Sequence, residues 1–301
     1  MDTIAKIKNI ASDVLISEPM SKHTFYRIGG PAKIFVAPEN TGELKEVIEI
    51  CKQDKIEFFI LGKGSNVLVS DSGYDGCIID FSKYFTKISS YGDLITAQSG
   101  SRLSEIASVA EMNSLTGFEE FAGIPGTLGG ALIMNAGCYG SEISDKISSV
   151  NVLTNGNVVT IDKKDLKFGY RRSSLKGSII LEAVISLEKG DAKLISERIA
   201  EFKIKRKNNQ PLNMPSCGSV FKRPADNFAG KLIEDCGLKG KSIGGAMVSD
   251  LHAGFIVNTG NARSEDVLSL IKHIKKEVFN RYQVQLEEEV IFLGFKNGEL
   301  E

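Results

Sequence analysis

The sequence predicts an α+β protein in which short apolar strands alternate with amphipathic helices. Residues 41–53 carry apolar side chains at helical spacing, and a strand at 57–61 follows them and runs directly into a glycine loop. Valine-rich segments flank Asn155-Gly156, which is the preferred pair for the type I′ turn of a β-hairpin. A helix, a strand, a glycine loop and a further strand in this order are typical of an α/β unit.

The first half of the chain is predicted to hold two helices. Thr41 is expected to cap the helix at 41–53, and apolar strands follow at 67–69 and 77–79. A second helix at 101–113 places four apolar residues on one face: Leu103, Ile106, Ala107 and Ala110. The glycine-dense stretch 117–140 lacks the periodicity of a long helix and is too apolar for a linker.

The middle of the chain is predicted to contain the hairpin at 149–161, a β-branched strand at 178–187 and an amphipathic helix at 192–208. The apolar face of that helix is expected to combine four residues: Leu194, Ile195, Ile199 and Phe202. The basic run at 203–207 is interpreted as a solvated helix end. Two prolines mark a boundary at 210–215.

After this boundary we expect a short helix at 229–235, which Gly237 ends, and a longer helix, which Ser264 caps. A strand at 288–293 closes the chain. The buried stripe of the longer helix is predicted to contain six residues: Val267, Leu268, Leu270, Ile271, Ile274 and Val278.

Composition narrows the functional class. The 301 residues allow two or three domains, and the net charge of −1 gives no basic excess for nucleic acid. No apolar run is long enough for a membrane helix and no signal-peptide pattern opens the chain, so we expect a cytoplasmic protein. The five cysteines include no CxxC pair and the three histidines do not cluster. We therefore expect neither disulfides nor a metal site.

Two glycine-rich loops, at 61–66 and 123–131, are candidates for holding phosphate or a flat ring. Glycine lets a ligand approach the backbone, and successive N–H groups form an anion-binding nest. The first loop matches neither the phosphate loop of NTPases nor the dinucleotide fingerprint. A tight turn explains the first loop equally well, and a close backbone crossing remains an alternative for the second.

Three polar residues in distinct local settings suggest redox chemistry on a substrate that carries a carboxylate. Arg171 offers the two parallel N–H donors that match a carboxylate, although Arg172 has the same chemistry. Ser219 offers a hydroxyl, but Ser216 and Cys217 are not separated from it by sequence alone. Glu289 offers a carboxyl group within the acidic run 287–289, where strand alternation places the central residue on the opposite face. A surface ion pair, a turn residue and a solvated run are the alternatives.

Seven ordered landmarks give the chain a resemblance to the UDP-N-acetylenolpyruvoylglucosamine reductase family, in its shorter form. They are Thr24–Ala32, Leu61–Asn66, Gly123–Ala131, Asn135–Gly140, Tyr170-Arg171, Gly218–Pro224 and Leu286–Val290. The resemblance implies FAD as cofactor, NADPH as electron donor and UDP-N-acetylglucosamine enolpyruvate as substrate in peptidoglycan precursor synthesis. It also implies a two-part FAD-binding region of the vanillyl-alcohol-oxidase type, 1–80 with 289–301 and 81–200, and an α/β substrate domain at 201–288.

The resemblance also implies roles for individual residues. Arg171, Ser219 and Glu289 correspond to catalytic positions, and Tyr170, in the same matching motif as Arg171, is expected to bind substrate. Lys222 and Arg223 are candidates for binding the diphosphate of the substrate, because both follow Ser219 closely. The implied FAD contacts are Arg27, Gly62, Gly64, Ser65, Asn66, Gly123, Ile124, Pro125, Gly126, Thr127, Gly129, Gly130, Asn135, Ala136 and Gly137. A flavin oxidase of the same superfamily and a flavin carrier without turnover are the competing functions. A monomer is compatible with the sequence, which leaves the oligomeric state open.

Overall fold

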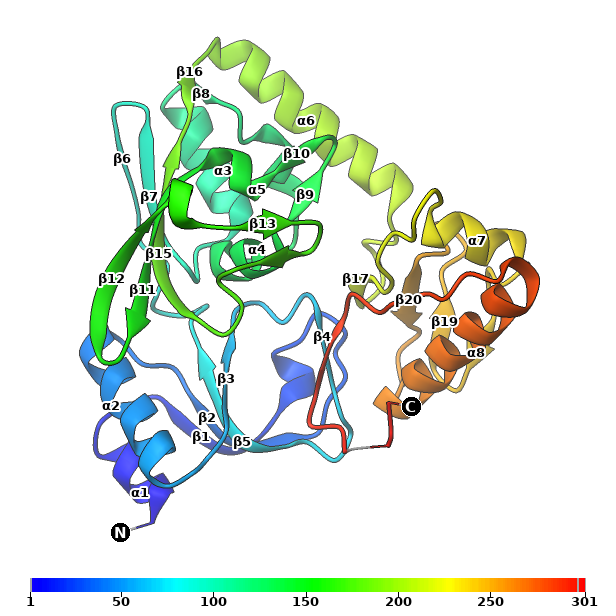
Figure 1. Ribbon diagram of the computed structural model, residues 1–301, viewed down its shortest axis with the longest axis horizontal. Coiled ribbons are helices and arrows are strands. Elements are labelled where there is room, and N and C mark those ends of the chain that lie inside the picture. Colours follow the sequence, from blue (N-terminus) through cyan, green and yellow to red (C-terminus); the bar gives the residue numbers. More distant parts are fainter. Residues whose placement is uncertain (1, 297, 301) are drawn as a thin grey trace. The chain divides into compact units, whose positions relative to one another are not determined.

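The computed structural model describes residues 2–296 and 298–300. The chain forms two compact units, each assembled from three stretches of sequence. Figure 1 labels the helices and strands along the chain. Unit 1 combines Met1–Val14, Val36–Lys63 and Ile78–Arg206. Unit 2 combines Leu15–Phe35, Gly64–Cys77 and Lys207–Glu301. The α+β class predicted from the sequence is confirmed by the mixture of helices and strands in both units.

A five-stranded antiparallel sheet forms the centre of unit 1. Its strand order is β12 (Asn157–Asp162), β11 (Ile147–Thr154), β15 (Ile179–Ser186), β7 (Leu94–Gln98) and β6 (Ile88–Tyr91). The predicted hairpin joins β11 to β12, because Thr154 pairs with Asn157 and both turn residues have positive φ, 49° at Asn155 and 75° at Gly156. Local turn chemistry therefore sets the register of this edge of the sheet.

The helices of unit 1 follow the apolar periodicity of the sequence. They are α1 (Thr3–Lys8), α2 (Thr41–Gln53), α3 (Leu103–Met112), α4 (Leu128–Met134), α5 (Ile143–Lys146) and α6 (Ala192–Asn209), the last of which ends beyond the boundary of the unit. The cap predicted at Thr41 is wrong. Asn40 caps α2, since its side chain accepts the N–H groups of Gly42 and Glu43. Leu194 was also expected on the buried face of α6, but it is 54% exposed.

Short elements connect these parts. Unit 1 contains the strand pairs β8 (Leu115–Thr116) with β16 (Glu188–Lys189), β9 (Gly137–Cys138) with β10 (Ser141–Glu142), and β13 (Phe168–Gly169) with β14 (Arg172–Ser173). Unit 1 also contains the 3-10 helices η2 (Glu119–Gly123) and η3 (Lys163–Asp165), whereas η1 (Met20–Lys22) belongs to unit 2. The core of unit 1 contains apolar side chains from the sheet, α3, α4 and the segment at η2: Ile95, Leu103, Phe118, Phe121, Leu132, Val150 and Ile185.

A further sheet has the order β1 (Val14–Pro19), β2 (Pro31–Val36), β5 (Tyr74–Asp80) and β3 (Phe58–Leu61). In unit 2, β4 (Val67–Val69) pairs in parallel with β21 (Ile291–Leu293). The strand predicted at 288–293 is therefore regular only from residue 291, and Glu288 forms an isolated bridge with Phe221.

The largest part of unit 2 is a four-stranded antiparallel sheet packed with two helices. The strand order is β17 (Ser216–Ser219), β20 (Phe255–Asn258), β19 (Ala246–Val248) and β18 (Ser242–Ile243). The helices are α7 (Ala229–Asp235) and α8 (Ser264–Tyr282). The predicted stripe of α8 is buried at Val267, Leu270, Ile271, Ile274 and Val278. It belongs to the same core as Tyr26, Leu68 and Val220.

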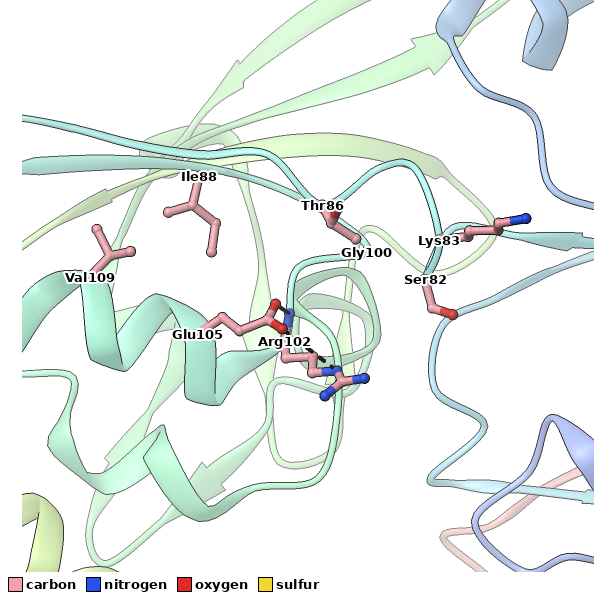
Figure 2. A pocket seen from close by; sticks show the side chains of 8 residues that line it. All are labelled: Ser82, Lys83, Thr86, Ile88, Gly100, Arg102, Glu105 and Val109. Atoms are coloured by element: carbon pink, nitrogen blue, oxygen red, sulfur yellow. Dashed lines mark hydrogen bonds and ion pairs between the residues drawn. The ribbon is translucent and has the colours of Figure 1, made fainter.

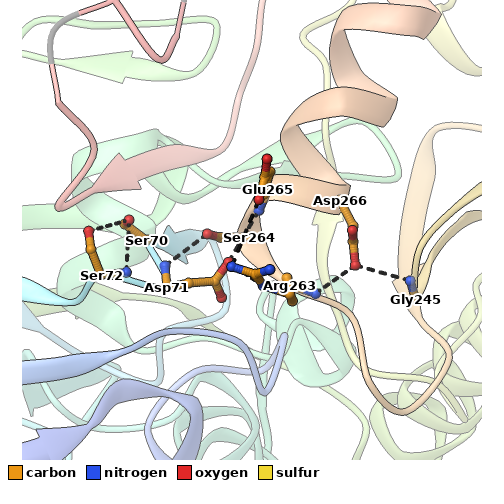
Figure 3. Close-up of polar contacts among 8 residues, drawn as sticks. All are labelled: Ser70, Asp71, Ser72, Gly245, Arg263, Ser264, Glu265 and Asp266. Atoms are coloured by element: carbon orange, nitrogen blue, oxygen red, sulfur yellow. Dashed lines mark hydrogen bonds and ion pairs between the residues drawn. The ribbon is translucent and has the colours of Figure 1, made fainter.

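The N-terminus of α8 is tied to the loop after β4 (Figure 3). The main-chain N–H of Asp71 donates to Ser264 Oγ at 2.9 Å, and its carboxylate lies 3.6 Å from Arg263 Nε. The Asp266 carboxylate accepts the N–H groups of Arg263 at 2.9 Å and Gly245 at 3.0 Å. Ser264 was predicted to cap α8, but Arg263 is the N-cap and Ser264 is the first helical residue. The Ser264 hydroxyl therefore joins the start of α8 to the loop after β4, which is distant in sequence.

Candidate active site

The second glycine loop, residues 123–131, leads from η2 into the first turn of α4. Its main chain is held by bonds to the segment before α3: Leu128 N–H donates to Ser101 O at 2.9 Å and Gly129 N–H to Ser99 O at 2.8 Å. A Cβ added at Gly129 would lie 3.0 Å from Ser99 Cβ, and one at Gly123 would lie 2.9 Å from Arg206 Nε. Close packing therefore accounts for glycine at these two positions.

Gly130 differs from the other glycines of this loop. It is exposed, and the nearest atom to an added Cβ would be Thr127 Oγ1 at 3.7 Å. Gly130 is the third residue of α4, and among residues 2–296 and 298–300 no backbone hydrogen bond of a turn, loop or cap uses its N–H. The first N–H groups of a helix have no partner within the helix and favour anions. Gly130 thus presents an open backbone donor beside the Thr127 hydroxyl.

The two glycine loops meet within unit 1. A Cβ on Gly62 would lie 2.3 Å from Thr127 Oγ1, so only glycine fits at this position. The rest of the first loop belongs to unit 2, where Gly64 has φ of +59° and an added Cβ would lie 2.4 Å from His23 O. Phe25 N–H donates to Gly64 O at 3.1 Å, which fixes the loop further. Arg27 is exposed in the same unit and has a positive φ of 55°.

Arg171 occupies the turn of a tight hairpin. Gly169 pairs with Arg172, so Tyr170 and Arg171 form a two-residue loop in which Arg171 has φ of 53°. A non-glycine residue in the left-handed region is strained, and such strain clusters at functional sites. The guanidinium carbon lies 5.2 Å from the centre of the Tyr170 ring. A Cβ on Gly137 would lie 3.7 Å from Arg171 Nη1, so the side chain lies along the loop at 135–137.

Asn135 connects that loop to the Arg171 hairpin. It ends α4 in the left-handed conformation with φ of 43° and is fully buried. Its Nδ2 donates to Glu142 Oε2 at 2.7 Å and to Gly169 O at 3.2 Å. Ala136 N–H donates to Ala131 O at 2.8 Å. The side chain of Asn135 therefore supports the base of the hairpin that carries Arg171.

Ser219 ends β17, just after a bulge. Ser216 pairs with Val257 and Ser219 with Phe255, and the irregularity between them includes Gly218 at φ of +81°. The bulge redirects the strand, as bulges often do beside functional side chains. Ser219 is half-buried, and its Oγ lies 3.4 Å from Phe221 O. Gly254 lies beside it, because a Cβ there would come within 3.3 Å of Ser219 Oγ.

The structure separates Ser219 from Cys217, the alternative donor that the sequence left open. Cys217 is 2% exposed and packs in the core of unit 2 against Tyr26. Burial raises the pKa of the Cys217 thiol to about 12, although the hydrogen bond with Tyr26 opposes this shift. Burial likewise raises the pKa of Tyr26, whose hydroxyl donates to Ile256 O at 2.9 Å. Cys217 is therefore a core residue with a weakly acidic thiol.

Glu289 lies on the chain segment that runs alongside the continuation of β17. Glu289 N–H donates to Val220 O at 2.7 Å, and Lys222 N–H donates to Glu287 O at 2.9 Å. The backbone of Glu289 is thus bonded to the residue next to Ser219, and unit 2 brings these two predicted catalytic residues onto neighbouring chain segments. Arg171 belongs to unit 1.

Two residues of the acidic run form ion pairs with lysines. Glu287 pairs with Lys222 at 3.1 Å, and Glu288 pairs with Lys275 of α8 at 2.7 Å. Arg223 places its guanidinium 4.5 Å from the ring centre of Phe228. The two cations predicted to bind the substrate thus have neighbours within unit 2: Lys222 is half-buried beside a carboxylate, and Arg223 is exposed and lies over an aromatic ring.

Sequence comparison assigns the chain to a family. Residues 210–293 match the UDP-N-acetylenolpyruvoylglucosamine reductase C-terminal domain, and residues 32–162 match the FAD binding domain family. A reductase of that name from Caldanaerobacter subterraneus subsp. tengcongensis is 48% identical and covers 97% of this chain and 98% of its own. The chain belongs to the UDP-N-acetylenolpyruvoylglucosamine reductase family. The resemblance inferred from the ordered motifs is confirmed.

Two further reductases of the family agree with this assignment. One from Clostridium perfringens is 45% identical over 94% of this chain and 93% of its own. The crystal structure of the Thermus caldophilus reductase superimposes with a TM-score of 0.81 at 32% identity and covers 93% of this chain and 98% of that one. The α+β fold with an FAD-binding region is therefore confirmed along nearly the whole chain.

The residues of this family member fit the FAD that the family implies. The open N–H of Gly130, next to the Thr127 hydroxyl, suits a phosphate or ring oxygen. The close contact between Gly62 and Thr127 holds part of the first loop against the second. The individual FAD contacts named from the sequence stay predictions. Among residues 2–296 and 298–300, no group of three His, Cys, Asp or Glu side chains is arranged to hold a metal ion.

Two side chains near the candidate site were not predicted from the sequence. His252 packs against Gly254 and Gly230, and burial lowers its pKa. Its Nδ1 accepts the Gly254 N–H at 3.0 Å, so the ring is held beside the residue that faces Ser219. Arg206 was included in the solvated basic run, but it is only 7% exposed and lies 6.0 Å from the Tyr139 ring centre. This burial could not be predicted from the sequence, because it depends on the packing of Arg206 against the loop at Gly123.

A cavity of about 390 Å³ lies elsewhere in unit 1, beside the start of α3 (Figure 2). Arg102 and Lys83 line it, but each is already paired. Arg102 Nε lies 3.7 Å from Glu105, whose carboxylate also accepts the Arg102 N–H, and Lys83 Nζ lies 2.6 Å from Asp13. The cavity includes none of the predicted site residues.

Among the described residues, no helix is both long and apolar enough to span a membrane.

Proposed function

We propose that this chain reduces the enolpyruvyl group of UDP-N-acetylglucosamine enolpyruvate to give UDP-N-acetylmuramate, with NADPH as electron donor and FAD as cofactor. The observation that carries the proposal is the likeness, at 48% identity over 97% of the chain, to a reductase of this name. Bound FAD would supply hydride transfer from NADPH to the terminal methylene carbon of the substrate. The chain's own residues then have to bind the carboxylate, stabilise negative charge and deliver a proton.

FAD would be held by the two glycine loops and their neighbours. Gly130 and Thr127 offer an N–H and a hydroxyl, and Gly62 keeps the first loop close enough to contribute. Within unit 2, the predicted FAD contacts are Ser65, Arg27 and, through its main-chain N–H, Asn66. Backbone donors suit this task because they approach the cofactor closely and are already fixed by the fold.

Arg171 would bind the substrate carboxylate. Negative charge develops on the carbon next to the carboxylate and spreads onto its oxygens, so a fixed cation stabilises the transition state more than the ground state. A guanidinium presents two parallel donors and remains charged. The strained backbone at φ of 53°, supported by Asn135 through Gly169, would aim the side chain before substrate arrives.

Ser219 would donate the proton to the carbon that carries the negative charge. A serine hydroxyl is a weak acid, but a carbanion is a strong base and takes the proton when the two are in contact. Ser219 follows the bulge at Gly218, and its hydroxyl lies next to Gly254. Because Gly254 has no side chain, this neighbour leaves the hydroxyl uncovered. The competing donor, Cys217, is buried in the core with its thiol pKa raised to about 12.

Glu289 would provide the second acid group of the site. If it carries a proton, its carboxyl group can donate to an oxygen of the enolate, whereas an ionised carboxylate would oppose the charge. Its backbone bond to Val220 O at 2.7 Å ties it to the Ser219 strand. Lys222 and Arg223 would bind the diphosphate of the substrate, since cations suit phosphate groups. Tyr170 is the third predicted substrate contact.

The same proposal covers organisation and location. Residues 1–80 with 289–301, and 81–200, would form the two FAD-binding parts, and 201–288 would bind the substrate. The protein would act in the cytoplasm on a small UDP-sugar and not on nucleic acid, and a monomer is compatible with the sequence. Gel filtration with light scattering checks the oligomeric state.

Steady-state assay with product analysis tests the proposal. The purified protein, loaded with FAD, should oxidise NADPH only when the enolpyruvyl substrate is present, and mass spectrometry should show that the product has gained two hydrogens. NADPH oxidation that consumes oxygen and leaves the enolpyruvyl compound intact would indicate an oxidase. Bound flavin without NADPH oxidation would indicate a carrier.

A further inference from the structure

The short parallel ladder of β4 and β21 ends beside Glu289. Val67 pairs with Ile291, and Ile291 N–H donates to Asn66 O at 3.0 Å. Asn66 is the last residue before β4, and Glu289 lies two residues before β21. The residue that carries the candidate acid thus lies just outside regular strand pairing.

The side chain of Asn66 continues the ladder by one step. Its Nδ2 donates to Glu289 O at 3.1 Å, just before the first residue pair of the ladder, Val67 with Ile291. On the other side, Glu289 N–H donates to Val220 O at 2.7 Å. The main chain of Glu289 is therefore held by its carbonyl from one segment and by its N–H from another.

Asn66 is itself held by a rigid loop. Gly64, two residues earlier, has φ of +59°, and Phe25 N–H donates to its carbonyl at 3.1 Å. A Cβ at Gly64 would lie 2.4 Å from His23 O, so the loop is packed closely against that segment. A side chain anchored on such a loop can fix the position of another residue, whereas a mobile one could not.

We propose that Asn66 is a positioning residue for Glu289, which it holds through the Glu289 carbonyl. This role deepens the proposed reduction and rests on it, because it concerns the acid of that reaction. It assigns the side-chain N–H of Asn66 to the protein and not to the cofactor. Loss of the bond allows the Glu289 backbone to drift, and displacements of about 1 Å are enough to slow a positioned proton transfer on the order of a hundredfold.

Two variants test the proposal, each loaded with FAD. Asn66→Asp keeps the shape but replaces the donor by an acceptor, and Asn66→Ala removes the side chain. Asn113→Ala is the control, because Asn113 Nδ2 also donates to a main-chain carbonyl, that of Val109 at 2.8 Å, within α3 and its cap. FAD affinity, flavin reduction by NADPH and flavin reoxidation by the enolpyruvyl substrate are measured separately.

The expected result is selective. Both Asn66 variants should bind FAD and accept electrons from NADPH within about twofold of wild type, while reoxidation by substrate slows at least tenfold. Asn113→Ala should leave all three unchanged. Loss of FAD affinity with normal reoxidation in the remaining loaded protein would overturn the proposal and make Asn66 a cofactor ligand.

A second measurement does not depend on activity. Hydrogen exchange of the apoprotein should show the N–H groups of Glu289 and Ile291 exchanging about three- to tenfold faster in Asn66→Ala, as expected for one lost hydrogen bond. Exchange in β19 should be unchanged. Equal exchange in variant and wild type would refute the clamp. If wild type fails to reduce the enolpyruvyl substrate, the proposed function fails, but this exchange experiment still decides whether Asn66 holds Glu289.

Discussion

Replacing Gly254 by alanine tests the surroundings of Ser219 most sharply. The added Cβ would lie 2.9 Å from His252 Cε1, 3.1 Å from His252 Nδ1 and 3.3 Å from Ser219 Oγ. The imidazole cannot withdraw freely, because its Nδ1 accepts the Gly254 N–H at 3.0 Å and the ring lies 4.9 Å from Phe255. One methyl group therefore presses on a fixed ring and on the candidate proton donor at once.

The magnitude follows from two opposing effects. Overpacking a filled site costs about 1–3 kcal/mol. Alanine in place of glycine recovers about 0.4–1 kcal/mol through the unfolded chain, since the φ of Gly254 is not positive. The net loss of unfolding free energy should be about 0.5–2 kcal/mol, measured by urea denaturation at equilibrium. In stopped-flow experiments, flavin reduction by NADPH should stay near wild type while reoxidation by the substrate slows.

Gly230→Ala is the matched control, because its Cβ would lie 3.2 Å from the same His252 Cε1 without approaching Ser219. Gly230 is in α7, where alanine favours the helix by about 1 kcal/mol, so this variant should be as stable as wild type or more so. Slowed reoxidation in Gly254→Ala alone supports the argument. A Gly254→Ala protein with unchanged stability and unchanged reoxidation would refute it.

Three further predictions concern single side chains. Ser219→Ala should leave flavin reduction by NADPH near normal and slow reoxidation by the substrate by orders of magnitude; equal rates in stopped flow would remove Ser219 from the chemistry. Arg171→Lys should be severely impaired in the same half-reaction, because a point charge cannot reproduce the two-pronged contact, and wild-type turnover would count against the clamp. Burial lowers the pKa of His252 below its ordinary value of 6.5, so folding favours the neutral imidazole. This stabilisation is fully present above pH 6.5 and is lost as the pH falls from 6.5 through the lowered pKa. Urea denaturation between about pH 7 and 5 should therefore show a steeper loss in wild type than in His252→Gln, and parallel curves would contradict this.

Much of the fold was predictable because the signals are local. The Asn155-Gly156 turn and the helix Ala229–Asp235 before Gly237 depend on residues within a few positions of each other. The helix caps were harder. Asn40 and Thr41 are adjacent cap-forming residues, and the choice of Asn40 emerged only with the backbone geometry. The Ser264 hydroxyl, expected as a cap, accepts the Asp71 N–H, which comes from a loop that is distant in sequence.

The candidate site was predictable as a set of motifs but not as a set of environments. Ser219 and Cys217 differ by burial, which depends on the packing of Tyr26 against β17. Arg206 was read as solvated because its neighbours are lysines, yet it packs against the loop at Gly123. Most glycines of the two loops are needed for close packing, whereas Gly130 is exposed and an added Cβ there would make only an ordinary contact with Thr127 Oγ1. None of these distinctions can be read from spacing.

The most direct test of the central claim is a two-step anaerobic experiment on the FAD-loaded protein. NADPH should bleach the visible flavin absorbance, and the enolpyruvyl substrate, added next without oxygen, should restore it with one product molecule formed per flavin. Flavin that stays bleached after the enolpyruvyl substrate is added would contradict the account.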